Sequence, residues 1–415
     1  MSDASRPLLV DPTPAVHAND IDIDIESMLR LALAGGRVAP RRILLERSGS
    51  PTAALADGES AWRAAGLDED QRAALRRPAC DAMEAALRWH QAPGRAVIGW
   101  HDPDYPALLR KTASPPLALF VCGDASLLWQ PAVAVVGSRS PTPAGRDNTV
   151  GFAHAFVGAG ITVASGLAAG IDTVAHATAL AAGGPTYAVL GTGPDVAYPR
   201  GNERLQADIA QRGALVSEHP PGTGPRKEHF PSRNRILAGL TLGTLVVEAA
   251  HRSGALITAR LAAEAGREVF AVPGSIHNPL ARGCHRLIRD GATLVDDIEQ
   301  VLAGLAPVAQ TLASALRSRL GAPTTGDWPA APGQSPSSTP AAMRAATPIR
   351  PPGLNSSCDP PDHQRLWSCL GPDPSSMDQL VQRSGLTAAD VSSILLHMEL
   401  EGRVAAQHGR YFRRG

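Results

Sequence analysis

Between residues 132 and 305 the chain repeats one pattern, a short aliphatic run that ends in a turn. The runs are VAVVGSR, ITVASGLAAGID, TYAVLGTGPD, ALVSEHP, TLVVEAAHRSG, EVFAVPGS and ATLVDD, and Ala-rich amphipathic stretches of helical length separate most of them. The runs are apolar throughout rather than alternating, which is typical of strands buried on both faces. We therefore expect an α/β fold, a Rossmann-like, doubly wound parallel sheet covered by helices.

The composition of the sequence and the spacing of its apolar residues change on both sides of this region. Residues 1–24 are polar and rich in Pro and Asp, which favours a flexible tail. Residues 25–100 place apolar residues at helical spacing between Gly and Pro breaks, and predict a small helical domain. The α/β core is expected over 101–305, with a Pro-rich disordered linker over 306–362.

Residues 363–415 predict a winged helix. The segment SSMDQLVQRSGLTAADVSSILLHMELEG reads as helix, turn and capped second helix, and RVAAQHGRYFRR reads as a hairpin turning at His408-Gly409. The second helix carries no Arg or Lys, so it is poorly suited to reading a DNA duplex. We expect this domain to bind a partner or to add an auxiliary DNA contact.

Bulk composition gives no sign of a polyanionic partner, because Lys+Arg and Asp+Glu both total 39. Any nucleic-acid site must then be a local patch. Five cysteines without a CxxC pair, and the lack of a signal-peptide pattern, favour a cytoplasmic protein. No apolar run approaches the roughly 18–20 residues that cross a bilayer, so no membrane association is expected.

The ends of the predicted strands are the expected ligand site, because ligands of open parallel sheets bind outside the carboxyl ends of the strands. Small and polar residues gather at these ends. They are Gly137, Ser138 and Arg139, then Ser165 and Gly166, then Tyr198, Arg200 and Asn202, and finally Glu248, Ser253 and Gly254.

Arginines make phosphate the expected ligand at this edge. Arg139, Arg200, Arg233 and Arg235 offer forked donors, the last two flanking Asn234 at the apparent mouth of a buried strand. Glycine turns and helix N-termini would add backbone N–H groups to the same cradle. One glycine turn alone would be ordinary topology, but the whole set predicts an anion site.

Several alternatives stay open at single residues. Asp172 and His176 lie four apart and could form an acid–base or metal pair, although a helix N-terminal charge and a packed histidine explain them better. Glu248 is expected to accept N–H bonds from a neighbouring turn or to pair with an arginine of the RNR segment. Tyr198 and Phe230 could each stack a base or belong to the core.

No cofactor or metal is expected. The chain lacks the dinucleotide fingerprint GxGxxG after its first parallel strand, and it lacks the Walker motif. It also lacks HExxH, GxSxG and any Cys/His spacing typical of a metal site. The catalytic inventory is therefore thin, and we expect a binding protein rather than an enzyme.

Six ordered motifs resemble the DNA-processing protein A family, also called DprA or Smf. They are VAVVGSR, ASGLAAGIDTVAH, YAVLGTGPDVAYPRGN, FPSRNRILAGL, LVVEAAHRSGALITARLAAEAGREVFAVPG and GCHRLIRDGATLV, within residues 133–295. The helical segment is similar to the family's sterile-alpha-motif-like (SAM-like) domain, and the last domain resembles its winged-helix extension. One departure is GTGPD, where the family more often has Gly-Cys-Gly-hydrophobic-Asp.

The resemblance implies a cytoplasmic, non-catalytic protein that binds single-stranded DNA, loads the RecA recombinase onto it during natural transformation, and forms a homodimer. Carried onto this chain, it implies phosphate contacts at Arg139, Arg200 and the RNR motif, with backbone-side contacts at Ser165 and Gly166. The RNR motif supplies Arg233, Asn234 and Arg235.

A second interpretation is an enzyme acting on nucleotides. GTLVVEAAHRSG distantly resembles the PGGxGTxxE motif of lysine-decarboxylase-like phosphoribohydrolases, in which a glutamate serves catalysis. Here the PGG is missing, and Leu240-Thr241-Leu242 precedes Gly243-Thr244. In this interpretation Glu248 would be the catalytic residue.

Overall fold

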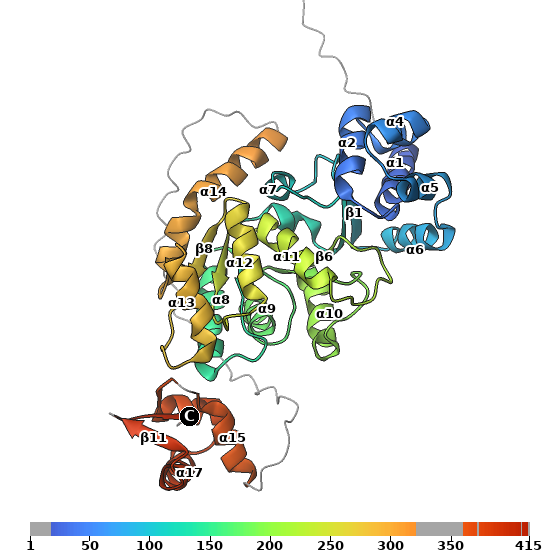
Figure 1. Cartoon of the computed structure of the whole chain (residues 1–415). Coiled ribbons are helices and arrows are strands. Elements are labelled where there is room, and N and C mark those ends of the chain that lie inside the picture. Colours follow the sequence, from blue (N-terminus) through green and yellow to red (C-terminus); the bar gives the residue numbers. More distant parts are fainter. Residues whose placement is uncertain (1–17, 321–359, 372, 408, 414–415) are drawn as a thin grey trace, which may run out of the picture. The chain divides into compact units, whose positions relative to one another are not determined.

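The computed structural model describes residues 18–320, 360–371, 373–407 and 409–413 (Figure 1). The chain divides into two compact units, residues 1–313 and 314–415. The first 17 residues of the expected tail and residues 321–359 of the expected linker lie outside the described ranges.

The larger unit is built on a nine-stranded sheet with the order β1-β2-β6-β5-β4-β3-β7-β8-β9. Strands β6, β5, β4, β3, β7, β8 and β9 pair in parallel, while β2 pairs antiparallel with both β1 and β6. The strands are β1 (Arg95–Gly99), β2 (Ala118–Gly123), β3 (Ala132–Val136), β4 (Thr162–Ser165), β5 (Thr186–Leu190), β6 (Ala214–Ser217), β7 (Gly243–Val246), β8 (Glu268–Ala271) and β9 (Thr293–Leu294).

The predicted α/β class is confirmed, and the burial of the strands explains why their sequences do not alternate. All five residues of β3 are buried, and successive side chains enter different cores. Val133 and Val135 pack in one core, and Ala132, Ala134 and Val136 pack in the other. Both faces of the strand are therefore covered by helices, which removes every polar position from the strand.

Two helical layers cover the sheet. One core contains residues of α8 (Pro143–Gly158), α9 (Ile171–Ala181) and α14 (Ile298–Arg319). The other contains residues of α11 (His229–Leu240), α12 (Ala255–Glu264) and α13 (Arg282–Arg289). Helix α10 (Glu203–Arg212) follows β5 and joins α9 in a smaller cluster.

The strand order reverses at β3. From β3 the chain moves outward through β4, β5 and β6, and it then returns to β7 on the other side of β3 before continuing to β8 and β9. The crevice at such a reversal, at the carboxyl ends of the strands, is where doubly wound sheets bind ligands. The turn after β3 therefore occupies the central position of the expected site.

Between residues 18 and 90, six helices pack on the sheet's β1–β2 end. Met28, Trp62 and Trp89 share a core with Phe120 of β2, and the rings of Trp89 and Phe120 meet edge-on at 6.0 Å. The helices are α1 (Ala18–Leu33), α2 (Val38–Ser48), α3 (Pro51–Ala56), α4 (Gly58–Ala64), α5 (Glu69–Arg76) and α6 (Cys80–His90).

Three expected boundaries differ from the observed ones. The tail was expected to reach residue 24, but α1 begins at Ala18. The helical domain was expected to reach residue 100, but β1 within it belongs to the large sheet. The linker was expected from residue 306, but α14 continues to Arg319 because Leu312 is buried in the core.

The smaller unit contains the expected winged helix. Helix α16 (Met377–Ser384) starts with a capping box at Ser376 and ends at Gly385 in the left-handed conformation. Its other elements are α15 (Pro361–Cys369), α17 (Ala388–Leu400), and a sheet of β10 (Ser375–Ser376), β12 (Arg410–Arg413) and β11 (Val404–Gln407). Arg403 and Arg413 lie over the Trp367 ring, at 4.6 and 4.3 Å from its centroid, so part of the basic C-terminal segment is engaged within the domain.

Candidate nucleic-acid interface

The turn after β3 is held by the start of α9. The Ile171 amide donates to the Ser138 carbonyl at 3.1 Å. Gly170 makes this approach possible: its φ is +88°, and a Cβ there would lie 2.2 Å from the same oxygen. Arg139, which follows Ser138, is exposed, and no hydrogen bond or ion pair joins its guanidinium to another described residue. This fixed turn presents a free cation at the reversal of the strand order.

The turn after β4 is buried rather than open. The Ser165 hydroxyl donates to the Val135 carbonyl at 2.6 Å, and the Gly166 amide donates to Asp172 at 3.1 Å. The resemblance implied DNA contacts at both residues. Their burial and these internal bonds instead give Ser165 and Gly166 a part in holding the turn.

Arg233 is an internal residue and not a free phosphate donor. It is 7% exposed, and it donates to the carbonyls of Gly166, at 2.6 Å, and Val189. Burial lowers its pKa, the nearby Asp172 carboxylate raises it, and Arg139 lowers it further. Arg233 thus ties together the ends of β4 and β5, and the phosphate contact expected of it is not available in this structure.

The rest of the RNR segment is also engaged internally. Asn234 accepts a hydrogen bond from Arg233 at 2.9 Å. Arg235 pairs with Glu218 and donates to the Ser114 carbonyl at 2.7 Å. The segment lies within α11, not at the mouth of a strand as its sequence suggested, because the apolar run that follows it is the buried face of a helix.

The loop after β5 presents an exposed aromatic ring beside a free arginine. Tyr198 is 43% exposed and packs on Phe230, with ring centroids 5.1 Å apart. Arg200 is exposed and unpaired among the described residues. Asn202 differs from both, since it is buried and its side-chain amide donates to Leu167 and Thr173, each at 2.9 Å. Tyr198 can therefore stack a base, while Asn202 fixes the loop that carries it.

A pair of stacked histidines lies beside this loop, and no sequence pattern predicts it. The rings of His219 and His229 lie 3.9 Å apart at an angle of 20°, and His229 contacts the Gly191 carbonyl at 3.1 Å. Burial lowers the pKa of His219, opposed by Glu218 and reinforced by His229. Exposed Arg226 and Lys227 occupy the same loop and have no described ionic partner.

Glu248 has the structural role expected of it, with a different set of partners. It is 5% exposed and accepts hydrogen bonds from the backbone amide of Thr142, at 2.9 Å, and from its hydroxyl. Asn278 donates to it at 3.2 Å. The neighbouring-turn alternative is thus correct, and the pairing with an RNR arginine is wrong. Ser253 accepts the Ala255 amide at 3.3 Å, and Gly254 is exposed at the start of α12.

Asp172 and His176 do not form an acid–base pair. Burial raises the pKa of Asp172, opposed first by Arg233, and lowers the pKa of His176 to about 3. His176 contacts the Thr186 hydroxyl through Nδ1 at 2.7 Å, and that hydroxyl donates to the Val163 carbonyl. The explanation by a helix N-terminal charge and a packed histidine is therefore correct. Within the described ranges no cluster of His, Cys, Asp and Glu could hold a metal ion.

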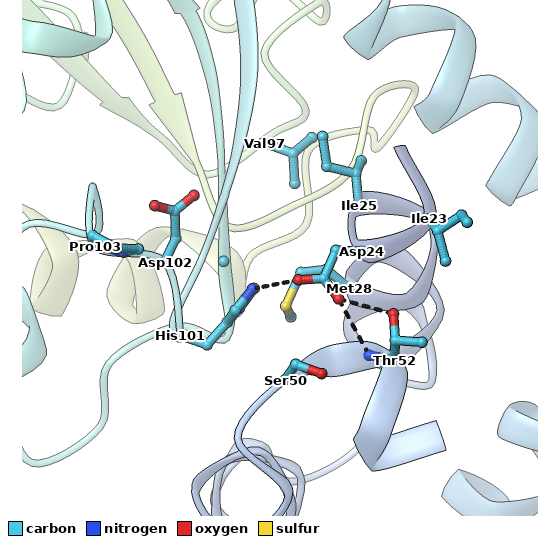
Figure 2. A pocket seen from close by; sticks show the side chains of 11 residues that line it. Ile23, Asp24, Ile25, Met28, Ser50, Thr52, Val97, His101, Asp102 and Pro103 are labelled. Carbon is cyan, nitrogen blue, oxygen red and sulfur yellow. Dashed lines mark hydrogen bonds and ion pairs between the residues drawn. The ribbon is translucent and has the colours of Figure 1, made fainter. Parts of the chain in front are cut away.

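A pocket of about 630 Å³ lies between α1 and the residues that follow β1, and none of the predicted site residues lines it. Figure 2 shows His101 reaching Asp24 across it, with Nε2 and Oδ2 3.4 Å apart. Asp24 also accepts the Thr52 hydroxyl at 2.8 Å. These contacts join the N-terminal helices to the end of β1. The pocket is therefore part of the interface between these packed elements.

Comparison with known proteins identifies the family. The family model for DNA recombination-mediator protein A matches residues 96–306, which is half of the chain. The chain belongs to the DNA recombination-mediator protein A family. A model of the DprA winged helix domain matches residues 343–410.

Curated relatives agree with this membership. Protein Smf of Escherichia coli is 38% identical over 333 residues, which cover 80% of this chain and 81% of the relative. DNA processing protein DprA of Streptococcus pneumoniae is 48% identical over 223 residues, covering 54% of this chain and 78% of the relative. The crystal structure of that pneumococcal protein matches with a TM-score of 0.60 and 37% identity, over 67% of this chain and 96% of its own. The DNA recombination-mediator membership gives this chain a DNA-processing role in recombination.

No helix in the described ranges combines the length and apolar character needed to span a membrane.

Proposed function

We propose that this chain binds single-stranded DNA along the carboxyl edge of its sheet and performs no chemistry on it. The observation that carries the proposal is the set of exposed cations there, none of which has an ionic partner among the described residues. They are Arg139 after β3, Arg200 after β5, and Arg226 and Lys227 after β6. Guanidinium and ammonium groups on one rim suit a phosphate chain, and a rim with Tyr198 stacked on Phe230 suits unpaired bases.

Single strands are favoured over duplex by the kind of contact available. Stacking on Tyr198 needs a base whose face is free, and a base inside a duplex has no free face. The winged helix does not change this preference, since α17 carries no Arg or Lys to read a major groove.

The direct test is competition between labelled single-stranded and duplex oligonucleotides of one sequence, followed by fluorescence anisotropy. The proposal expects the single strand to bind more tightly, and it expects Tyr198→Ala to reduce that preference. Equal affinity for both forms, or tighter binding of the duplex, would contradict the proposal.

The absence of catalysis is part of the proposal. Glu248, the carboxylate that the enzyme interpretation would use, already accepts three hydrogen bonds, which leaves it a poor base or nucleophile. Incubation with nucleoside monophosphates should release no free base. Turnover abolished by Glu248→Gln would instead support the phosphoribohydrolase alternative.

The remaining expectations concern the cellular location, the oligomeric state and the protein partner of this chain. We infer that the chain acts in the cytoplasm, forms a homodimer and delivers single-stranded DNA to RecA, as its family resemblance implies. Light scattering should then give a mass twice the 43.2 kDa of the chain. A pull-down with the full chain tests the interaction with RecA. If RecA is not recovered, the proposed function is restricted to DNA binding alone.

A further inference from the structure

A second group of free arginines lies on the β7 side of the strand reversal. Arg146 is on the first turns of α8, Arg252 follows β7, and Arg282 begins α13. All three are exposed, and no hydrogen bond or ion pair joins their side chains to another described residue. None of them was among the residues that the strand ends suggested.

The hydrogen bonds around Glu248 bring these segments together. Its carboxylate accepts hydrogen bonds from the backbone amide and hydroxyl of Thr142 before α8, and from the side-chain amide of Asn278 after β8. The next residue, Ala249, donates to the Leu280 carbonyl and accepts from the Gly283 amide, each at 2.7 Å. A Cβ at Gly283 would lie 2.5 Å from the Ala249 carbonyl, so this contact is close-packed.

The same arrangement connects with the turn that carries Arg139. A Cβ on Gly137 would lie 2.9 Å from the Glu248 carbonyl, which places the turns after β3 and β7 in contact. Arg139 therefore stands between two groups of cations, one beyond β5 and β6 and one around Glu248. The charge changes sign at the next strand, because exposed Asp296 and Asp297 follow β9.

We propose that the DNA path continues past the strand reversal onto a β7-side surface made by Arg146, Arg252 and Arg282, and that it ends before β9. This extension rests on the proposed function. From β6 to β8 the edge crosses five strand intervals of about 4.8 Å, or roughly 24 Å, which matches about seven phosphates at a stacked spacing of about 3.4 Å. A strand shorter than this can occupy one group of cations only.

The test is a length series of oligo(dT), from dT4 to dT16, bound to the full chain at several salt concentrations. The variant is Arg252→Ala/Arg282→Ala, and the matched control is Arg77→Ala/Arg88→Ala, which removes two exposed arginines from the N-terminal helices. All three proteins should melt at the same temperature, because the four side chains are exposed.

The extension predicts a defect that depends on oligonucleotide length. On dT12 the variant's salt slope should be less negative by about 1.4, since each phosphate contact on a single strand contributes about 0.7. The wild type should then lose about sevenfold more affinity than the variant between 50 and 200 mM salt. On dT4 the wild type and the variant should differ by less than about twofold, because the other cations still hold a short strand.

The two proposals fail in different ways. If the wild type binds dT12 and the Arg252→Ala/Arg282→Ala variant has the same affinity and salt slope, the extension is wrong and the proposed function stands. If the control variant shows the same loss as the test variant, the effect is one of net charge and the extension is again wrong. If the wild type binds no oligo(dT) of any length, both proposals are overturned.

Discussion

At the scale of single residues, arginines that look equivalent in the sequence divide into two kinds. Arg139 and Arg200 are exposed and unpaired among the described residues, whereas Arg233 and Arg235 are bound to carbonyls and, for Arg235, to Glu218. The difference comes from distance along the chain. The carbonyl partners of Arg233 lie 67 and 44 residues away, so no local pattern reveals them.

This division predicts opposite effects for two alanine substitutions. Arg139→Ala should weaken binding of single-stranded DNA and leave the free energy of unfolding unchanged within about 0.5 kcal/mol, as for most surface substitutions. Arg233→Ala should lower the free energy of unfolding by about 2–4 kcal/mol, because the buried carbonyls of Gly166 and Val189 lose their donor. Urea denaturation and an anisotropy titration on both variants check this, and a stable Arg233→Ala protein would contradict the internal role.

His176 gives a pH prediction. Its folded pKa is about 3, below the unfolded value near 6.5, so the unfolded chain binds the proton more readily in acid. The stability contributed by the neutral ring is complete above about pH 6.5 and is lost progressively as the pH falls toward 3. At pH 5 the loss should be about 2 kcal/mol.

The matched variant is His176→Asn. The asparagine amide can still donate a hydrogen bond to Thr186, and it does not titrate. Urea denaturation between pH 7.5 and 5 should show a smaller loss of stability in the variant than in the wild type. Identical pH dependence in both proteins would show that the wild-type ring is not held neutral.

At the scale of elements, the strands were predictable and the start of α11 was not. The continuous apolar runs identified the parallel strands, because a strand that is buried on both faces is apolar along most of its length. Helix α11 begins at His229 after Glu228, whose side chain makes no capping hydrogen bond, so its first turn carries no start signal. The stacked pair of His219 and His229 was hidden for a similar reason, since it joins the end of β6 to the start of α11.

The turn between β4 and α9 should be intolerant of any side chain at Gly166. A Cβ there would lie 2.1 Å from the Arg233 guanidinium, which cannot move without losing its two carbonyl partners. Gly166→Ala should therefore lower the free energy of unfolding by about 3 kcal/mol. Gly151→Ala is the control, because Gly151 lies inside α8 with open space around it and alanine should stabilise it by about 0.5–1 kcal/mol. Thermal unfolding of both variants tests this prediction. Equal melting temperatures would show that the turn has room for a side chain at Gly166.

At the scale of the whole molecule, a chain with no net charge places several exposed cations, unpaired among the described residues, along one edge of its large sheet. The family membership fits this arrangement, and the winged helix adds little to it, because Arg403 and Arg413 are engaged with Trp367 and α17 carries no Arg or Lys. The long-range part of the DNA affinity should therefore belong to the larger unit.

Truncation after Leu320 tests whether the larger unit binds DNA without the winged-helix unit. The shortened protein keeps all of α14, whose Leu312 is buried in the core, so it should fold and bind single-stranded DNA within about threefold of the full chain, a cost below 1 kcal/mol. A loss of tenfold or more in the anisotropy titration would assign a main DNA contact to the winged-helix unit.

The central claim, that free cations at the carboxyl edge of the sheet hold a single-stranded phosphate backbone, is tested most directly by the salt dependence of binding. With Arg139, Arg200, Arg226 and Lys227 engaged, a plot of log affinity against log salt should have a slope of about −3 or steeper, at about −0.7 per phosphate contact. Replacing all four residues with alanine should bring the slope close to zero, or to about −2.1 if Arg146, Arg252 and Arg282 also take part. A shallow slope in the wild type, or an unchanged slope in the fourfold variant, would contradict the account.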